Sequence, residues 1–388
     1  MKIPAHRIYF TEDEIAKGQE ALKDIMSTGQ MILGKYTEEF EQKYAELHGR
    51  KYGIAVASDT AGIEILLRIY GLHEGDQVLF PANGFFGIVI PILRCKATPF
   101  FFDMEKDTNL FATQSMVYHY LTTYPQIKVV ILMHTGGLVA SYSKEISSLC
   151  KQFDTFCIED AAHAPGSILN GNYAGSFGDA SVFSLYATKP LNAGEGGIIL
   201  TDDPEIARLC KVYRNYGRES SFGSGIHTVE GYSWRLTEIQ AAIGINQVKR
   251  QDEIRKERQQ LAFNYNALVE DLREIGIHRF KMTDGTDPNW YRYLMMFPED
   301  WTTLEKKLFN KIMLEEWGVQ IPGDVYERLA HRQPLWRGRY DHLHFPIAQE
   351  WVDRHFALPL YNSLSEDEQY YIVKATKESF LKVEGLLK

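Results

Sequence analysis

The sequence has few cysteines, no long apolar run and no excess of positive charge, and each absence excludes a class of protein. The four cysteines, Cys95, Cys150, Cys157 and Cys210, show no paired spacing and lie in apolar or helical surroundings. We read them as free, buried thiols of a reducing compartment, and we expect neither disulfides nor a metal site. No apolar run approaches the roughly 18 residues of a membrane-spanning helix, and the N-terminus, MKIPAHRIYFTEDE, lacks the order of a signal peptide. A cytoplasmic protein without a membrane partner is therefore expected.

The sequence also argues against a nucleic-acid-binding protein and against a nicotinamide-dependent dehydrogenase. The net charge of −9 argues against a nucleic-acid partner by bulk electrostatics. A nicotinamide-binding dehydrogenase would carry G-x-G-x-x-G after its first strand, and GIAVASDTAG does not supply it. Hydrophobic residues at 45% and charged residues at 24% are ordinary globular values, and 388 residues suit two domains.

From residue 53 onward, apolar runs typical of strands alternate with helical patterns. Strands are predicted at 53–58, 77–82, 97–104, 128–135 and 155–160, with helices at 61–72 and 86–95. This alternation predicts a doubly wound, mostly parallel sheet flanked by helices. Residues 1–250, including two N-terminal helices, are predicted to form this large α/β domain, and 251–388 a smaller α+β domain. A single long helical region, 236–273, is expected to join them.

The stretch from Cys157 to Thr201 holds the groups that a pyridoxal phosphate site needs. Asp160 ends the run TFCIED, which places a carboxylate at the carboxyl edge of the sheet, where open α/β sheets bind ligands. His163 follows, Ser184 lies within the next run, SVFSLY, and Lys189 lies just beyond that run. Pyridoxal phosphate requires a lysine amine for its Schiff base and a buried carboxylate beside its pyridine nitrogen. Singly, each residue fits a helix cap or a solvated surface; together they favour the cofactor.

The phosphate of such a cofactor has a candidate site at Ser58, Asp59 and Thr60. They lie between a predicted strand and a helix, where backbone amides and the helix dipole attract anions. Alone, the same residues would be read as N-cap residues. Ser184 would offer a hydroxyl from the other side. Phe85, after the glycine turn of PANGFF, is a candidate to stack on the cofactor ring, although packing in the core is the alternative.

With these residues in place, the chain resembles the DegT/StrS family of sugar aminotransferases, within the fold-type-I pyridoxal phosphate superfamily. The resemblance covers nearly the whole length, and its most specific blocks, in this order, are IEDAAHAPGS, VFSLYATK and GEGG. It implies Lys189 as the Schiff-base lysine, Asp160 as the partner of the pyridinium nitrogen and His163 near the ring hydroxyl. It also implies Phe85 on the ring, with Ser58, Asp59, Thr60 and Ser184 around the phosphate.

The resemblance further implies a homodimer whose active sites are shared across the interface. The loop before the long helix, GYSWRL, would deliver Ser233 and Arg235 to the neighbouring site. Two departures from the family pattern stand out, because Asp59 replaces a glycine and Ser233 replaces an asparagine. A carboxylate beside a phosphate dianion is repulsive, so we expect the cofactor to bind less tightly than in relatives.

The resemblance implies a ping-pong transfer of an amino group from glutamate or glutamine to a keto sugar, in amino sugar biosynthesis. Relatives most often aminate a 3- or 4-keto carbon of a nucleotide-linked deoxysugar. His227, Tyr326, His331 and Gln333 lie in segments that approach the substrate in relatives, although a structural role remains the simpler reading of a lone histidine. The alternatives are a sugar dehydratase of the same fold, against which Lys189 argues, and a non-catalytic sensor or regulator.

Overall fold

The centre of the larger part of the chain is a seven-stranded sheet with the order β1-β9-β8-β5-β4-β2-β3. The computed structural model describes residues 1–106, 111–219, 225–323 and 327–387. All neighbouring strands are parallel except the two pairs that involve β9. The predicted mostly parallel sheet is therefore confirmed. Its strands are β1 (Tyr52–Val56), β2 (Gln77–Pro81), β3 (Thr98–Phe102), β4 (Ile127–Met133), β5 (Phe156–Asp160), β8 (Ala180–Ser184) and β9 (Gly197–Thr201).

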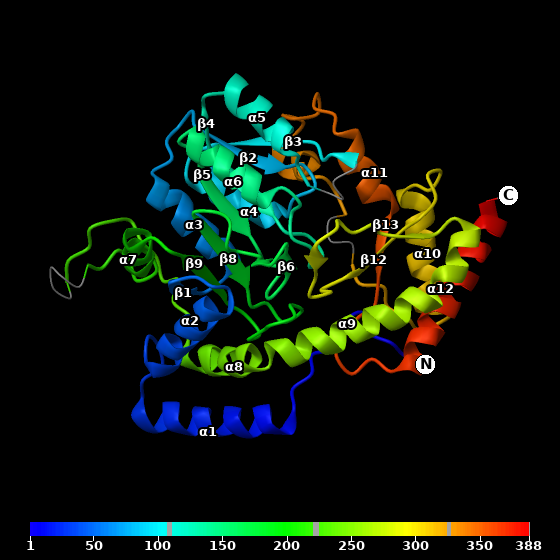
Figure 1. The fold of residues 1–388 in the computed structure, drawn as a ribbon, viewed down its shortest axis with the longest axis horizontal. Helices are drawn as coiled ribbons and strands as arrows, with labels where there is room; N and C mark the ends of the chain where they lie inside the picture. Colours follow the sequence, from blue (N-terminus) through cyan, green and yellow to red (C-terminus); the bar gives the residue numbers. More distant parts are fainter. Residues whose placement is uncertain (107–110, 220–224, 324–326, 388) are drawn as a thin grey trace.

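Helices cover both faces of this sheet (Figure 1). The central strands β8 and β9 are buried at every residue, as expected for strands packed on two sides. Parallel strands need crossover connections. Helices supply those between β1 and β2, β2 and β3, β3 and β4, and β4 and β5, whereas the connection from β5 to β8, residues 161–179, is described throughout and contains no helix. The helices that follow the strands are α3 (Asp59–Tyr70), α4 (Phe86–Arg94), α5 (Gln114–Thr123), α6 (Ser143–Gln152) and α7 (Pro204–Tyr213).

The two N-terminal helices pack on the helix α8, which begins at Glu238. α1 (Glu12–Thr28) begins with the predicted capping box between Thr11 and Glu14, and α2 (Lys35–Leu47) follows. Glu238, the first residue of α8 (Glu238–Lys249), accepts hydrogen bonds from the N–H groups of Gly34, Tyr36 and Thr37. A buried carboxylate thus caps the N-terminus of α2, which favours negative charge.

The prediction of one continuous helical region over 236–273 is wrong in one respect. The region is divided at Arg250, between α8 and α9 (Gln251–Leu268), and it ends in the short 3-10 helix η3 (Glu270–Ile275). No proline or glycine marks the break. The Arg250 guanidinium pairs with both Glu14 of α1 and Glu253 of α9, and these tertiary contacts hold the junction. α9 then carries the chain across to the C-terminal elements (Figure 1).

The C-terminal part contains a small antiparallel sheet and helices with a core of their own. β10 (His278–Arg279), β12 (Tyr293–Met296) and β13 (His355–Leu358) form this sheet in the order β10-β12-β13. Its core is rich in aromatic residues, with Phe297 stacked on Phe356 at 4.2 Å between ring centroids. The helices of this part are α10 (Thr303–Glu315), α11 (Pro346–Arg354) and α12 (Glu366–Leu387), with the 3-10 helices η4 (Ala330–Arg332) and η5 (Pro334–Trp336).

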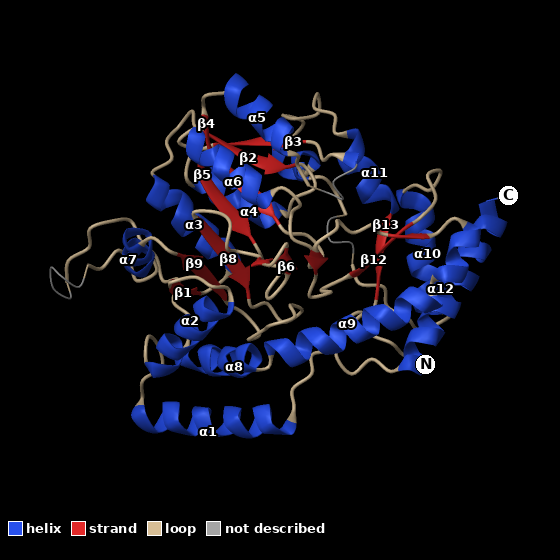
Figure 2. Cartoon of the chain, in the orientation of Figure 1, coloured by secondary structure: helices blue, strands red, loops and turns tan. Residues whose placement is uncertain are grey.

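Several contacts join the two parts of the chain. A second small sheet pairs β11 (Thr286–Asp287) with β6 (Ile168–Leu169), which also pairs with β7 (Asn172–Tyr173). Residues Trp336, Tyr340 and Trp351 belong to the same hydrophobic cluster as the large sheet. At the N-terminus, Ile3 pairs with Val319, and both chain ends lie on the C-terminal side of the molecule (Figure 2).

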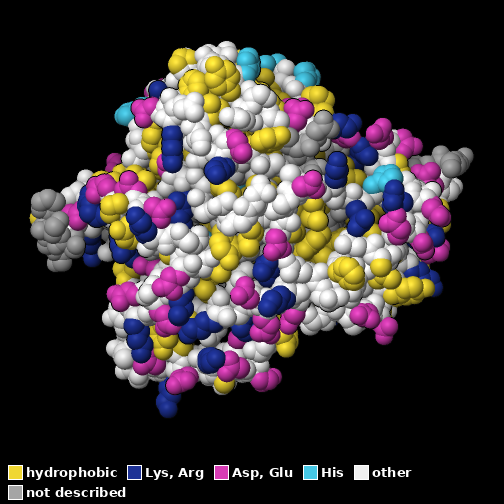
Figure 3. Space-filling model, in the orientation of Figure 1, with side chains coloured by type: hydrophobic (Ala, Val, Ile, Leu, Met, Phe, Trp, Pro, Cys, Tyr) yellow, Lys and Arg dark blue, Asp and Glu magenta, His cyan; other side chains and the backbone are white. Residues whose placement is uncertain are grey.

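The surface and the cysteines complete the description. Lys and Arg side chains are interspersed with Asp and Glu over the face shown in Figure 3. All four cysteines are free and buried, as predicted. In the described part of the chain, no helix is both long and apolar enough to cross a membrane.

Candidate active site

A cavity of about 360 Å³ lies at the carboxyl ends of the parallel strands. Residues that follow five different strands, β1, β2, β4, β5 and β8, meet there, because parallel strands place their carboxyl ends at one edge of a sheet. Of the predicted cofactor residues, those that line the cavity are Ser58, Asp59, Thr60, Phe85, Asp160, His163, Ser184 and Lys189. The strand-end residues that sequence analysis selected are therefore brought together in one place.

The N-terminus of α3 forms one end of the cavity. Ser58 is the N-cap, and its hydroxyl accepts the N–H of Ala61 at 3.1 Å. The first-turn N–H groups of a helix have no intrahelical partner and carry partial positive charge. The first residue of β9, Gly197, packs directly on this backbone, since a Cβ on Gly197 would lie 2.6 Å from the nitrogen of Asp59. This end of the cavity can bind an anion such as a phosphate group.

Asp160 presents a buried carboxyl at the end of β5. Its Oδ1 accepts the N–H of Ala162 at 3.0 Å. Burial raises the pKa of Asp160, while the N–H of Ala162 and the charge of Lys189 oppose that effect. A cationic group bound beside Asp160 would favour the ionised carboxylate. The protonated pyridine nitrogen of pyridoxal phosphate is such a group.

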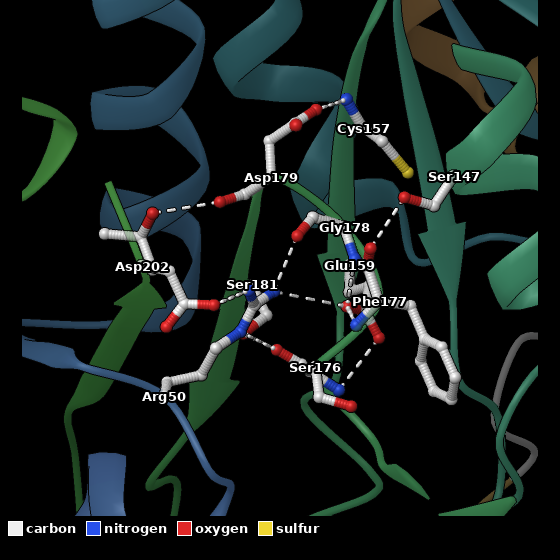
Figure 4. Close-up of polar contacts among 12 residues, drawn as sticks. Arg50, Ser147, Cys157, Glu159, Ser176, Phe177, Gly178, Asp179, Ser181 and Asp202 are labelled. Carbon is white, nitrogen blue, oxygen red and sulfur yellow. Dashed lines mark hydrogen bonds and ion pairs between the residues drawn. The ribbon is translucent and has the colours of Figure 1, made fainter. Parts of the chain in front are cut away.

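The residue before Asp160 anchors the strand from the opposite face. Glu159 is fully buried and accepts the N–H groups of Gly175, Phe177 and Gly178 at 2.6 to 2.8 Å (Figure 4). Arg50 lies 3.8 Å away and donates to the carbonyls of Gly175 and Gly178. These donors and His134 lower the pKa of Glu159 although burial, the largest effect, would raise it.

His134 connects this network to the cavity, which it lines. Its Nδ1 accepts the N–H of Ala140 at 3.1 Å, so the proton lies on Nε2, which donates to Glu159 at 2.9 Å. Its backbone N–H donates to the carbonyl of Asp160 at 2.9 Å. The carboxyl end of β5 is therefore held by fully satisfied polar groups, and the position of Asp160 is fixed with it.

Lys189 faces an aromatic ring that sequence analysis did not select. Its Nζ lies 4.9 Å from the centroid of Tyr291, whose hydroxyl is 3.2 Å from Thr188 Oγ1. The Arg292 guanidinium lies 4.4 Å from the same ring and donates to the Tyr291 hydroxyl at 3.2 Å. Burial would raise the pKa of Tyr291, but the positive charges of Lys189 and Arg292 outweigh it and lower that pKa. Tyr291 thus contacts the amine that is proposed to react.

His163 is held as a neutral imidazole on the other side of Tyr291. The ring centroids lie 4.5 Å apart, and Nδ1 accepts the N–H of Gly136 at 3.2 Å. Burial, with Lys189 and Arg292 nearby, lowers the pKa of His163 well below its ordinary value. Its proton therefore lies on Nε2, and the ring can act as a hydrogen-bond donor in the cavity.

The other predicted residues that the structure describes do not line this cavity. Ser233 and Arg235 hydrogen-bond to each other at 2.7 Å in the loop before α8, and His227 Nδ1 contacts the carbonyl of Tyr216 at 2.7 Å in the same loop. His331 is 1% exposed and packs on Phe101 and Phe345. Gln333 lies beyond it in the same segment. Tyr326 lies outside the described residues.

The cavity also contains residues without a clear signal in the sequence. Tyr291 and Arg292 directly precede β12, and the N–H of Arg292 bonds to the carbonyl of Gly136 at 3.0 Å. A polar pair before a strand-like run is the one available hint. The lining residues not selected from sequence are Met133, His134, Ala162, Tyr186, Thr188, Glu195, Gly196, Tyr291, Arg292 and Gly323.

Comparison with known proteins gives consistent results. A sequence model of the DegT/DnrJ/EryC1/StrS aminotransferase family matches residues 12–377. The spore coat polysaccharide biosynthesis protein SpsC of Bacillus subtilis is 30% identical over 376 residues, covering 93% of this chain and 94% of SpsC. GDP-perosamine synthase of Escherichia coli O157:H7 is 29% identical over 379 residues, covering 97% and 98%. The structure of NtdA from Bacillus subtilis, with bound cofactor PMP, matches with a TM-score of 0.84 at 25% identity, covering 96% of this chain and 83% of NtdA.

Proposed function

The chain belongs to the DegT/DnrJ/EryC1/StrS aminotransferase family, and we propose that it transfers an amino group from glutamate or glutamine to a keto sugar, with pyridoxal phosphate as cofactor. The observation that carries this proposal is the cavity at the sheet edge. It combines an amine, a buried carboxyl and a helix N-terminus, contributed by Lys189, Asp160 and α3. The bound PMP of NtdA, an aminated form of this cofactor, supports the choice.

The residues fit pyridoxal phosphate at each of its functional ends. The N-terminus of α3, with Ser58, Thr60 and Ser184, would hold the phosphate. Asp160 would hold the ring nitrogen, and the half-exposed face of Phe85 is available for stacking. When bound, the cofactor supplies an aldehyde that accepts the amino group and an electron-poor ring that stabilises negative charge.

The protein side chains divide the work of proton transfer and orientation. Lys189 would hold the cofactor through its amine, and the free amine would move a proton to and from the donor Cα. Asp160 keeps a proton on the ring nitrogen through its negative charge. His163, oriented by the N–H of Gly136, would donate a hydrogen bond from Nε2 to a group bound in the cavity. The donor leaves as an oxo acid before the keto acceptor enters, so the two substrates use one cavity in turn.

The acceptor that we propose is a nucleotide-linked 3- or 4-keto deoxysugar. The support is the relative GDP-perosamine synthase, whose name is that of a nucleotide-linked sugar. We also propose a cytoplasmic homodimer in which a second copy supplies Ser233, Arg235 and His227. Their position outside the cavity of their own chain supports this assignment, because the loop that carries them is then available to a neighbour.

The proposal is tested by attaching the cofactor. Wild-type protein incubated with pyridoxal phosphate and reduced with borohydride should carry the cofactor mass on the peptide containing Lys189. Lys189→Ala should lose the modification while keeping its fold by circular dichroism. Lys151→Ala, which removes an exposed lysine of α6 that does not line the cavity, is the matched control. Modification of many surface lysines without preference for Lys189, or none at all, would contradict the proposal.

A further inference from the structure

Asp59 is the residue in the cavity whose chemistry the proposed function does not use. It is the first residue of α3, where an acidic side chain meets the favourable end of the helix dipole. It lines the cavity, it is 8% exposed, and its Oδ1 has no hydrogen-bond partner within the described structure. An ionised carboxylate in that position would hold a buried charge with no hydrogen-bond donor for Oδ1, which is unfavourable.

The charges around Asp59 add to this effect. Asp160 faces it from β5 and Lys189 from the turn after β8, and Glu195 lines the same cavity from the turn before β9. His134, His163, Tyr291 and Arg292 also line the cavity. Burial, first, and the charge of Asp160, second, raise the pKa of Asp59 well above its ordinary value, while Lys189 opposes the shift. Burial and the charge of Asp160 thus both favour the neutral acid form of this carboxyl.

A neutral carboxyl differs from a carboxylate in what it can bind. It carries an O–H donor, whereas a carboxylate can only accept hydrogen bonds. At the N-terminus of α3 this donor would add to the first-turn N–H groups and to the hydroxyls of Thr60 and Ser184. The repulsion expected from the sequence then disappears, because the group next to the anion is uncharged.

Resting on the proposed function, we propose that Asp59 binds the phosphate group of the cofactor as a neutral carboxylic acid that donates a hydrogen bond to it. Phosphate binding then requires the Asp59 proton. When alkaline pH removes this proton, two like charges face each other and the cofactor is released more readily. Cofactor binding would then depend on pH through Asp59, whereas a glycine at this position would give no such dependence.

The experiment compares wild-type protein with Asp59→Asn, whose amide donates a hydrogen bond and cannot ionise. Infrared difference spectra of the two pyridoxal phosphate complexes at pH 7.5 should show the carbonyl stretch of a protonated carboxyl in the wild type. Over the pH range in which this band is lost, the ratio of the wild-type Kd for pyridoxal phosphate to that of Asp59→Asn should rise about tenfold per pH unit. Pyridoxal, which lacks the phosphate, should show no such difference. Asp203→Asn, at the N-terminus of α7, is the control and should follow the wild type.

Three results would overturn the inference while leaving the proposed function intact. They are an ionised Asp59 in the complex at pH 7.5, cofactor binding by Asp59→Asn at least about tenfold tighter than wild type at that pH, and an equal effect on pyridoxal. Absence of pyridoxal phosphate binding by the wild type and both variants would overturn the inference together with the proposed function. The measured quantities are spectra and affinities, so they do not depend on finding the keto acceptor.

Discussion

Tyr291 lies between the groups that carry charge in the cavity. Its ring is 4.9 Å from Lys189 Nζ and 4.4 Å from the Arg292 guanidinium, and His163 packs against it at 4.5 Å. A cation over an aromatic face gains about 0.5 to 2 kcal/mol, depending on its exposure to water. The ring therefore orients the Lys189 amine and keeps it from other positions in the cavity.

Replacing Tyr291 separates the role of the ring from that of the hydroxyl. Tyr291→Phe keeps the ring and loses the hydrogen bonds to Thr188 and Arg292, so we expect a loss of stability of about 1 kcal/mol. Tyr291→Leu also loses the cation contact, and the rate at which Lys189 attaches to pyridoxal phosphate should fall about tenfold. The rate is measured by stopped-flow absorbance, with Tyr370→Leu on the exposed side of α12 as control. Equal rates in the Phe and Leu variants would show that the ring does not orient Lys189.

The site residues whose positions could be predicted from the sequence are those that come at or just after the end of a strand. Asp160 and Ser184 end buried strands, and Lys189 comes soon after, so their approach follows from the order of strands in a parallel sheet. Tyr291 and Arg292 reach the cavity through contacts between the two parts of the chain, such as the bond from Arg292 to Gly136. Nothing local in the sequence specifies that approach.

The turn between β8 and β9 sets the shape of the phosphate end. A Cβ on Gly197 would lie 2.6 Å from the Asp59 nitrogen and the Ser58 carbonyl carbon, so the two backbones touch because no side chain intervenes. Close approach of backbones is a physical reason for glycine at this position. The GEGG segment is thus a support for the N-terminus of α3 as well as a turn.

Gly197→Ala should displace α3 and weaken cofactor binding. We expect a loss of about 1 to 3 kcal/mol in the free energy of unfolding, as for other overpacked sites. The affinity for pyridoxal phosphate should fall more than the affinity for pyridoxal. Gly194→Ala is the control in the same turn, since its Cβ meets nothing within 4 Å although its φ of +84° adds strain. Equal losses of phosphate affinity in both variants would contradict this role for Gly197.

Among the secondary-structure elements, the strands and the starts of helices could be predicted from the sequence. The break within the long helical region could not. The capping box at Thr11 and the strand TFCIED follow from local pattern, and both are present. The division between α8 and α9 depends on Arg250 meeting Glu14, a residue more than two hundred positions away. Tertiary contacts of this kind leave no local signal in the helical pattern.

The whole molecule should lose stability in mild acid because it buries neutral histidines. His48 is fully buried, donates from Nδ1 to the carbonyl of Tyr44 at 3.1 Å and accepts the N–H of Gly166 on Nε2 at 3.0 Å. Burial lowers the pKa of His48 to about 4. The unfolded chain takes up a proton near pH 6.5, whereas the folded chain resists it until about pH 4.

This difference in proton uptake predicts how the free energy of unfolding changes with pH, and the sign of that change can be tested. The contribution of His48 is fully present above pH 6.5 and falls by about 3 kcal/mol as the pH decreases to 4. Urea unfolding between pH 7 and pH 4.5 measures how steeply the free energy of unfolding changes with pH. His48→Gln should reduce this slope by the equivalent of about one bound proton. His73→Gln, at an exposed position, should leave the slope unchanged. An unaltered slope in His48→Gln would contradict the assignment.

The assembly of two chains is testable by complementation. If a second copy supplies Arg235, a mixed dimer of Lys189→Ala and Arg235→Ala chains contains one intact site. Two inactive variants, refolded together in equal amounts, should then recover up to about a quarter of wild-type activity, because half of the dimers are mixed and each has one working site. Size-exclusion chromatography checks that the mixture is dimeric. No recovery in a mixture shown to be dimeric would place Arg235 in the cavity of its own chain or outside the site.

The most direct test of the account is a single half-reaction. Protein loaded with pyridoxal phosphate is mixed with L-glutamate or L-glutamine, and the oxo acid released is measured by mass spectrometry. The account predicts about one oxo acid per chain from one of these donors, with a matching change in the cofactor absorption, and none from Lys189→Ala. Loaded wild-type protein that releases no oxo acid from either donor would contradict the assignment of this chain as an aminotransferase that uses glutamate or glutamine.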